Sequence, residues 1–130
     1  MFASGRLTER PGRAAGARSA AWVASGRAGG VSRGHFETLN LAGHVGDDPG
    51  AVLANRRLAA AMLGVDAERL AVVNAVHGAE VAVVDHGGDV EGVDAVVTTS
   101  AGLGLLALAA DCVPLALADP AAAVVAAVHC

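Results

Sequence analysis

Residues 112–129 read CVPLALADPAAAVVAAVH. Two runs of small apolar residues flank an Asp-Pro pair, which is typical of a turn, so the stretch predicts a β-hairpin whose loop covers residues 119–122. In that register Cys112 lies opposite His129, and opposed side chains share one face of a sheet with Cβ atoms about 4.5–5.5 Å apart. A thiol and an imidazole are therefore expected to reach each other or to share one bound ion.

The clearest helix precedes the hairpin, at residues 47–64, DDPGAVLANRRLAAAMLG. Asp48 suits the N-cap, Pro49 the first helical position and Gly64 the C-terminal stop. The buried stripe expected for this helix consists of Ala54, Leu58, Ala61, Met62 and Val65.

Runs rich in valine and leucine predict strands on both sides of the helix. A short strand is expected around residues 21–24, and the others are expected within residues 70–78, 79–87, 93–99, 102–112, 114–118 and 123–130. The residues thus predict an α/β (α+β) chain in which strands dominate the second half.

Composition narrows the classes of function. The chain has 130 residues and is 54% hydrophobic, which favours one globular domain. Residues 1–20 show no period of 2 or 3.6 and are expected to form a disordered extension, so the domain is expected at residues 21–130. The rest of the chain is acidic, which disfavours nucleic-acid binding, and no apolar run is long enough for a membrane span. Only two cysteines are present, so a cytoplasmic location is expected.

The histidines and cysteines leave two chemistries open. Cys112 could be a nucleophile activated by His129, with Asp111 nearby, or Cys112 and His129 could be two ligands of a soft metal. A metal needs a third ligand, and His77, at the end of a valine-rich strand, is a candidate. Three other histidines are also present: His86 in an expected solvated turn, and His35 and His44 in a glycine-rich loop.

Four blocks of sequence resemble one family. They are GRAGGVSRGHFETLNLAGHVGDD, NAVHGAEVAVVD, VDAVVTTSAGLGLLALAADCVPLALADP and VVAAVH. Together they closely resemble the multicopper polyphenol oxidase family, also called the laccase-domain or peptidoglycan editing factor family. Its members are also described as purine nucleoside phosphorylases with adenosine deaminase activity. The match runs from about Val23 to His129 and resembles the N-terminal half of a family member.

The resemblance implies a fold and a site. The fold would be a mixed β-sheet flanked by helices, the laccase-domain or cytotoxic-necrotizing-factor-like fold, here truncated. The family's zinc ligands match His77, Cys112 and His129. The chain departs from the family at Ala75, where a glutamine is usual, and at Cys130, where the family continues with Ala-Gly-Trp-Arg-Gly.

The resemblance also implies substrates. The expected reactions are phosphorolysis of adenosine, inosine and methylthioadenosine, and deamination of adenosine by metal-activated water. The expected partners are therefore a purine nucleoside and phosphate, without nucleic acid or membrane. Arg27 and the glycine-flanked amides beside it could cradle an anion, and Asn40 and His44 are further candidates for substrate or phosphate binding.

Three alternatives remain open. A copper-dependent oxidase is the first, but the five histidines include no His-x-His pair for a trinuclear cluster, so only one copper on the same three ligands fits. Neither Met1 nor Met62 is placed to be an axial ligand. The second is an amide hydrolase acting on peptidoglycan precursors through Cys112, His129 and Asp111. The third is an inactive fragment.

Overall fold

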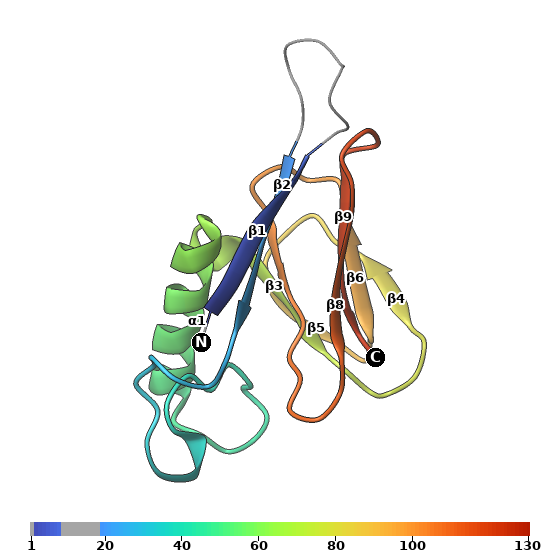
Figure 1. Cartoon of the computed structure of the whole chain (residues 1–130). Coiled ribbons are helices and arrows are strands. Elements are labelled where there is room, and N and C mark those ends of the chain that lie inside the picture. Colours follow the sequence, from blue (N-terminus) through green and yellow to red (C-terminus); the bar gives the residue numbers. More distant parts are fainter. Residues whose placement is uncertain (1, 9–18) are drawn as a thin grey trace.

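The computed structural model describes residues 2–8 and 19–130 (Figure 1). Its elements in chain order are β1 Phe2–Thr8, β2 Ser19–Ser25, η1 Gly34–Phe36, α1 Pro49–Leu63, η2 Ala67–Arg69, β3 Leu70–Asn74, β4 Val81–Val83, β5 Gly88–Glu91, β6 Ala95–Thr98, β7 Gly104–Leu106, β8 Pro114–Asp119 and β9 Val124–His129. The predicted mixed α/β architecture is confirmed, with α1 beside β2 and η2 on one flank.

The strands form three sheets. β1 and β2 form an antiparallel ribbon, β5-β3-β7 is a parallel sheet, and β4-β6-β9-β8 is mixed. In the mixed sheet only the β4–β6 pair is parallel. The parallel pairs require crossover connections, and their loops bring segments distant in sequence to the same edge of a sheet.

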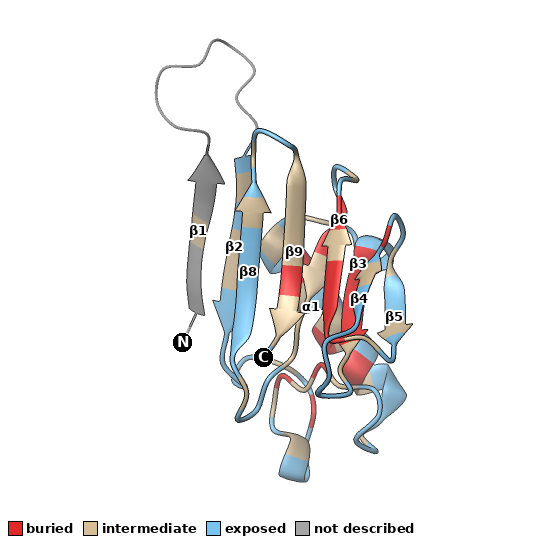
Figure 2. Ribbon diagram, turned by 90° about the vertical axis from the view of Figure 1, so that its right-hand side faces the viewer, coloured by how far each residue is buried: buried red, intermediate tan, exposed pale blue. Residues whose placement is uncertain are grey.

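The core is built from small aliphatic side chains and lies on both faces of β3, one part between the two larger sheets and one part between β3 and α1. One cluster contains Ala71, Val73, Val84, Val96, Leu103 and Ala127, and a second contains Ala60, Leu70 and Val72. Figure 2 shows this burial concentrated in β3 and β6, whereas β8 is largely exposed. β3 is covered on both faces, as its continuous apolar sequence predicts for a strand in a parallel sheet.

Helix α1 has the ends predicted for it. The Asp48 side chain accepts a hydrogen bond from the Gly50 amide at 2.9 Å, and Gly64 ends the helix in the left-handed region with φ 81°. Its buried face differs from the prediction. Asn55 is fully buried, whereas Leu58 is 40% exposed. The reason is that Asn55 faces inward to bind the polar loop at residues 32–40. A prediction based on the spacing of apolar residues does not detect a buried polar contact of this kind.

The rest of the predicted stripe also differs. Met62 and Ala61 are exposed, and Ala54 and Val65 are half-buried. The buried positions are instead Val52, Asn55 and Ala60.

The hairpin of β8 and β9 is confirmed, but its register differs from the predicted one. Pro114 lies opposite His129, the position predicted for Cys112, and Asp119 is still part of the strand. The Asp119 carboxylate accepts hydrogen bonds from the amides of Ala121 and Ala122 at 2.9 and 3.1 Å, so the loop covers residues 120–123. Because side chains alternate with period 2, a shift of two positions leaves Cys112 on the same side of the hairpin as His129.

Two strands lie where none was predicted. β5 has the sequence GDVE and pairs with β3. Its glycine and two acidic residues are uncommon in strands, so the sequence did not predict one there. β1 occupies residues 2–8, within the segment expected to be disordered, and its backbone pairs with β2. Residues 19 and 20 of that segment belong to β2, and the rest of it, residues 1 and 9–18, lies outside the described residues. No helix in the described part of the chain combines the length and the apolar character that crossing a bilayer requires.

Candidate metal centre

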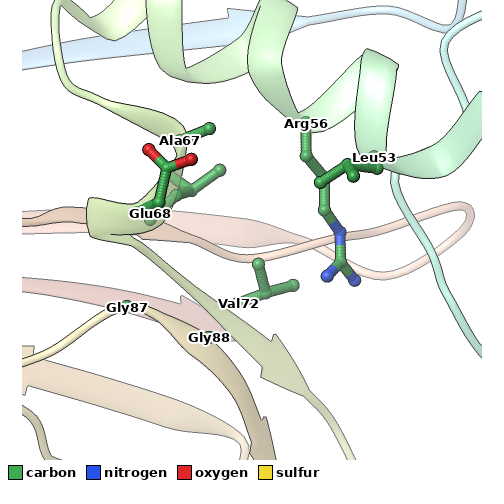
Figure 3. A pocket seen from close by; sticks show the side chains of 8 residues that line it. Leu53, Arg56, Ala67, Glu68, Val72, Gly87 and Gly88 are labelled. Carbon is green, nitrogen blue, oxygen red and sulfur yellow. The ribbon is translucent and has the colours of Figure 1, made fainter. Parts of the chain in front are cut away.

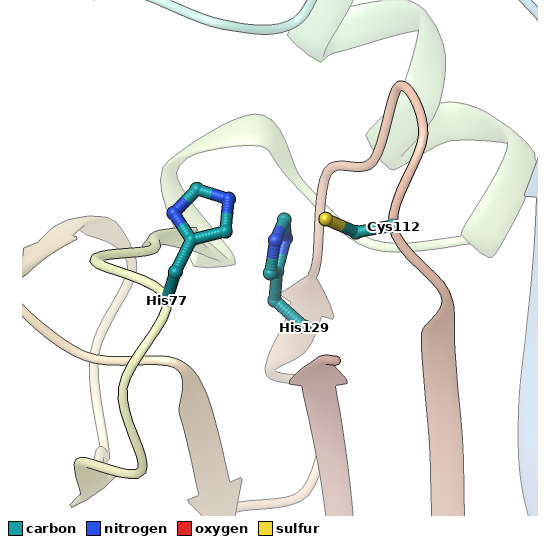
Figure 4. A group of neighbouring side chains, drawn as sticks. All are labelled: His77, Cys112 and His129. Carbon is teal, nitrogen blue, oxygen red and sulfur yellow. The ribbon is translucent and has the colours of Figure 1, made fainter.

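Three side chains converge at one edge of the mixed sheet. His77 comes from the loop after β3, Cys112 from the bend before β8, and His129 ends β9 (Figure 4). The two imidazoles and the thiol each offer one ligand atom, and these atoms all lie within 4.8 Å of one another. The structure therefore brings together the three residues that the family resemblance selected as zinc ligands.

The orientation of His129 is fixed by the backbone. Its Nδ1 lies 2.7 Å from the carbonyl oxygen of Leu108. A carbonyl can only accept, so Nδ1 carries the proton and donates it. Nε2 of His129 is buried and has no hydrogen-bond partner among the described residues. A buried nitrogen with a free lone pair, whose ring is held through the other nitrogen, is the arrangement of a metal-ligating histidine.

The His77 ring meets the His129 ring edge to face. The ring centroids are 4.9 Å apart and the planes make an angle of 87°. His77 has φ 59°, in the left-handed region that residues other than glycine rarely adopt. His77 is exposed, whereas Cys112 and His129 are half-buried, so a small molecule can approach the cluster from the His77 side.

Asp94 supports the loop that carries His77. Its carboxylate accepts hydrogen bonds from the amides of Val76 and His77 through one oxygen, at 2.9 and 2.7 Å, and from Gly78 through the other, at 2.9 Å. Asp94 is only 3% exposed. Burial raises the pKa of this carboxyl, but the amide hydrogen bonds outweigh it and hold the pKa below its ordinary value.

The donor set suits zinc. Two imidazoles and a thiolate are typical zinc ligands, and three protein ligands leave one position open, which is the arrangement of catalytic sites. The same set also suits a single copper ion.

The other predicted site residues have different roles in the structure. Arg27 donates to the carbonyl oxygens of Glu37 and His35 at 2.7 and 3.0 Å. The amides of Gly29 and Gly30 both donate to Thr38 Oγ1. These donors, which the sequence predicted for an anion, therefore stabilise the glycine-rich loop itself.

Asn40, His44 and Asp111 lie outside the group of three side chains that could hold a metal ion. Asn40 donates to the Asp47 carboxylate at 3.0 Å and also bonds to the backbone of Ala42. His44 and Asp111 are exposed. The group that orients His129 is the Leu108 carbonyl, not the Asp111 carboxylate that a Cys-His-Asp arrangement needs.

Two further polar residues tie α1 to the rest of the fold, and the sequence analysis missed both. Asn55 bonds to Ser32, Thr38 and Asn40, and Arg56 makes two hydrogen bonds to the Asp89 carboxylate at 2.8 and 2.9 Å. Arg56 lines a cavity of about 220 Å³ beneath α1 (Figure 3). Because its guanidinium is already paired, Arg56 joins helix and sheet there.

Asp94 and Leu108 were missed as well. Asp94 stands directly before a valine-rich strand in VDAVV, and an acid at the entrance to a buried strand is a signal that could have identified it. The role of Leu108 depends on its carbonyl, which no side-chain pattern indicates.

The family model and the curated relatives that match this chain agree with the family resemblance of its sequence. The family model described as multi-copper polyphenol oxidoreductase laccase matches residues 21–130. A purine nucleoside phosphorylase of Streptomyces coelicolor is 61% identical over 106 residues, covering 79% of this chain and 44% of that protein. One of Corynebacterium glutamicum is 46% identical and covers the same shares.

Solved structures are similar too. YlmD from Geobacillus stearothermophilus has a TM-score of 0.71 at 31% identity, with 98% of this chain and 44% of that chain covered. The protein NMB0706 from Neisseria meningitidis has a TM-score of 0.69 at 33% identity, with 82% and 43% covered. The chain thus spans less than half the length of these relatives.

Proposed function

This chain belongs to the multi-copper polyphenol oxidoreductase laccase family, and on that premise we propose that its His77, Cys112 and His129 hold zinc in an enzyme that acts on purine nucleosides. The substrate class is supported by relatives named purine nucleoside phosphorylase at 46–61% identity. The metal is supported by the geometry of the chain's own residues.

The observation that carries the metal is the buried Nε2 of His129. This atom has no partner among the described residues, although its ring is fixed by Leu108 and lies against His77. Leaving a buried polar atom unpaired costs about 1–3 kcal/mol unless a ligand occupies it. A cation between the two imidazoles and the thiolate accounts for that position.

In the proposed chemistry, His77, Cys112 and His129 hold the metal between them. Zinc, when bound, supplies a Lewis acid with an open coordination position for water, which is what hydrolytic deamination at C6 of adenosine requires. His129 and Cys112 bind from the half-buried side and exclude bulk water there. His77 binds from the exposed side, where a nucleoside can approach.

Phosphorolysis of adenosine, inosine and methylthioadenosine is the other part of the proposal, with phosphate as second substrate. Its support is the name shared by the curated relatives. The donors of Arg27 and of the Gly29 and Gly30 amides are used within their own loop, so phosphate would need other groups.

Copper is the second candidate for the same site. The observation in its favour is the donor set, because two imidazoles and one thiolate also bind a single copper ion. Amide hydrolysis by Cys112 and His129 has less support, since the carbonyl of Leu108 takes the place of an orienting carboxylate.

Metal analysis and product analysis test the proposal together. The purified chain is loaded with zinc or with copper and incubated with adenosine, with and without phosphate, and with a phenol. We expect about one zinc per chain, inosine as the product of deamination, and phosphate-dependent release of adenine. A copper-loaded chain that oxidises the phenol and leaves adenosine unchanged would contradict the proposed zinc chemistry.

The two cysteines supply a matched pair of variants. Cys112→Ser removes a proposed ligand, whereas Cys130→Ser removes an exposed thiol outside the three-residue group. Zinc content and turnover should be lost in the first and retained in the second. Full turnover in Cys112→Ser would overturn the site assignment.

A further inference from the structure

Asp94 is the residue through which the two histidine ligands are joined. Its carboxylate holds the amides of residues 76–78 around His77, and its main-chain carbonyl accepts the amide hydrogen of His129 at 2.8 Å. One residue therefore contacts the backbone of both histidines. Asp94 is thus placed where its position can influence the separation of the two imidazoles.

The conformation of His77 depends on this carboxylate. Three successive amides donate to the two oxygens of one carboxylate, so all three would lose their acceptor if that carboxylate were removed. His77 also sits at φ 59°, which costs energy for a β-carbon-bearing residue and persists only when the surroundings enforce it. The hydrogen bonds to Asp94 supply that enforcement on both sides of His77.

Asp94 itself is anchored. Its amide donates to the Glu80 carbonyl at 2.8 Å, and the amide of the next residue, Ala95, donates to the same oxygen at 3.1 Å. Ala95 then starts β6 and lies opposite Val128 of β9. Asp94 therefore binds the loop between β3 and β4 at two places, residues 76–78 and Glu80. Asp94 itself is nearly inaccessible to solvent.

We propose that Asp94 is a positioning residue for the metal centre, which sets the separation of the His77 and His129 imidazoles by bonding to the backbone of both. It touches neither metal nor substrate and acts through the two histidines. This inference rests on the proposed metal function, and its test includes a readout that needs no metal.

The test compares Asp94→Asn with Asp119→Asn. The asparagine at position 94 keeps the size of the side chain but replaces one acceptor oxygen by an amino group that faces amide donors. Asp119 is the matched control because its carboxylate also accepts two amides, in an exposed turn. The first readout is amide hydrogen exchange of Val76, His77 and Gly78 in the metal-free chain. The second is zinc affinity, measured by competition with a chromophoric chelator.

We expect Asp94→Asn to accelerate exchange at these three amides selectively and to weaken zinc binding by about 10–100-fold, the range for loss of a residue that supports metal ligands. Asp119→Asn should change neither readout. The inference would be overturned if Asp94→Asn exchanged the amides of residues 76–78 at the rate of the unmodified chain. It would also be overturned if the folded variant bound zinc with the affinity of the unmodified chain. Uniform acceleration at all amides with unchanged affinity would also overturn it, because that result indicates a stabilising role only.

A second variant covers the case in which Asp94→Asn does not fold. A β-carbon at Gly78 would lie 3.2 Å from Asp94 Oδ2, so Gly78→Ala displaces the carboxylate slightly and retains its charge. We expect a smaller change in the same direction, and unchanged exchange and affinity would contradict the inference. If the unmodified chain binds no zinc, the proposed metal function fails, while hydrogen exchange still decides the role of Asp94.

Discussion

Nδ1 of His129 lies 2.7 Å from the carbonyl oxygen of Leu108, and this contact leaves Nε2 of the same ring as the nitrogen available to an ion shared with His77 and Cys112. Leu108 belongs to the segment between β7 and β8, and His129 is the last residue of β9. A backbone carbonyl from one segment thus orients a side chain from another. The geometry of the proposed metal centre therefore depends on the packing of the sheet as well as on the three side chains.

This contact predicts the tautomer of His129. In the metal-free chain, above the pH at which the ring is protonated, the proton should reside on Nδ1, because Leu108 offers only an acceptor. Nitrogen-15 NMR of the imidazole distinguishes the two tautomers. A proton on Nε2 would contradict the proposed geometry, since no lone pair would then face the other ligands.

Asn55 should be a major determinant of stability. Its amide nitrogen donates to Ser32 Oγ, Thr38 O and Asn40 O, and its Oδ1 accepts from the Val31 amide. Asn55→Ala removes all four of these hydrogen bonds from a fully buried side chain, so we expect a loss of about 2–4 kcal/mol in the free energy of unfolding. Urea denaturation measures it.

The control for Asn55→Ala is Arg57→Ala, at an exposed position of the same helix. That change should alter the free energy of unfolding by less than about 0.5 kcal/mol. Equal effects of the two substitutions would show that the Asn55 hydrogen bonds do not hold the loop.

Local signals in the sequence predicted much of this fold. Asp48, Pro49 and Gly64 marked the ends of α1 correctly because caps act within one turn of the chain. The hairpin was predicted from its turn residues, but its register was two positions off. The Asp119 side chain bonds within the loop, and a sequence does not reveal that the aspartate remains in the strand.

The candidate site was predictable in part. The hairpin brought Cys112 and His129 to one side, but spacing alone could not select His77, which comes from a distant loop and was chosen by family resemblance. The two supports of the site each involve backbone: the Asp94 carboxylate binds the His77 amide, and the Leu108 carbonyl binds the His129 ring. An acid before a buried strand could have pointed to Asp94, but which backbone groups these two residues bind follows from tertiary packing, which side-chain patterns do not encode.

The close packing at Gly30 predicts intolerance to a β-carbon. A Cβ there would collide with the Thr38 carbonyl oxygen and with Asn55 Oδ1. We expect Gly30→Ala to lower the free energy of unfolding by about 1–3 kcal/mol, since overpacking displaces the surrounding backbone. Gly43→Ala is the control, because its Cβ would lie at an ordinary 3.5 Å from Arg56 Nη2. Equal thermal stability of the two variants would rule out the predicted collision.

The ion pair between Arg56 and Asp89 should account for part of the loss of folding stability at low pH. Hydrogen bonds from Arg56 hold the pKa of Asp89 below its ordinary value of 3.8, although burial raises it. Because the pKa is depressed in the folded chain, the pair stabilises fully above the ordinary pKa, and this stabilisation is lost as the pH falls through the lowered value. Asp89→Asn should therefore flatten the fall in unfolding free energy between about pH 5 and pH 2. The free energy of unfolding is measured by urea denaturation at several pH values in that range, for the unmodified chain and for Asp89→Asn. The same dependence on pH in the two proteins would contradict this prediction.

Titration of the metal-free chain with cobalt(II), followed by absorption, tests the central claim most directly, because a thiolate bound to cobalt gives a charge-transfer band and cobalt replaces zinc in sites of this donor set. The account predicts saturation at about one equivalent. The band should be lost on addition of zinc, absent in Cys112→Ser and retained in Cys130→Ser. A chain that gives no band, or a Cys112→Ser variant that gives the same band, would contradict the assignment of His77, Cys112 and His129 as a metal centre.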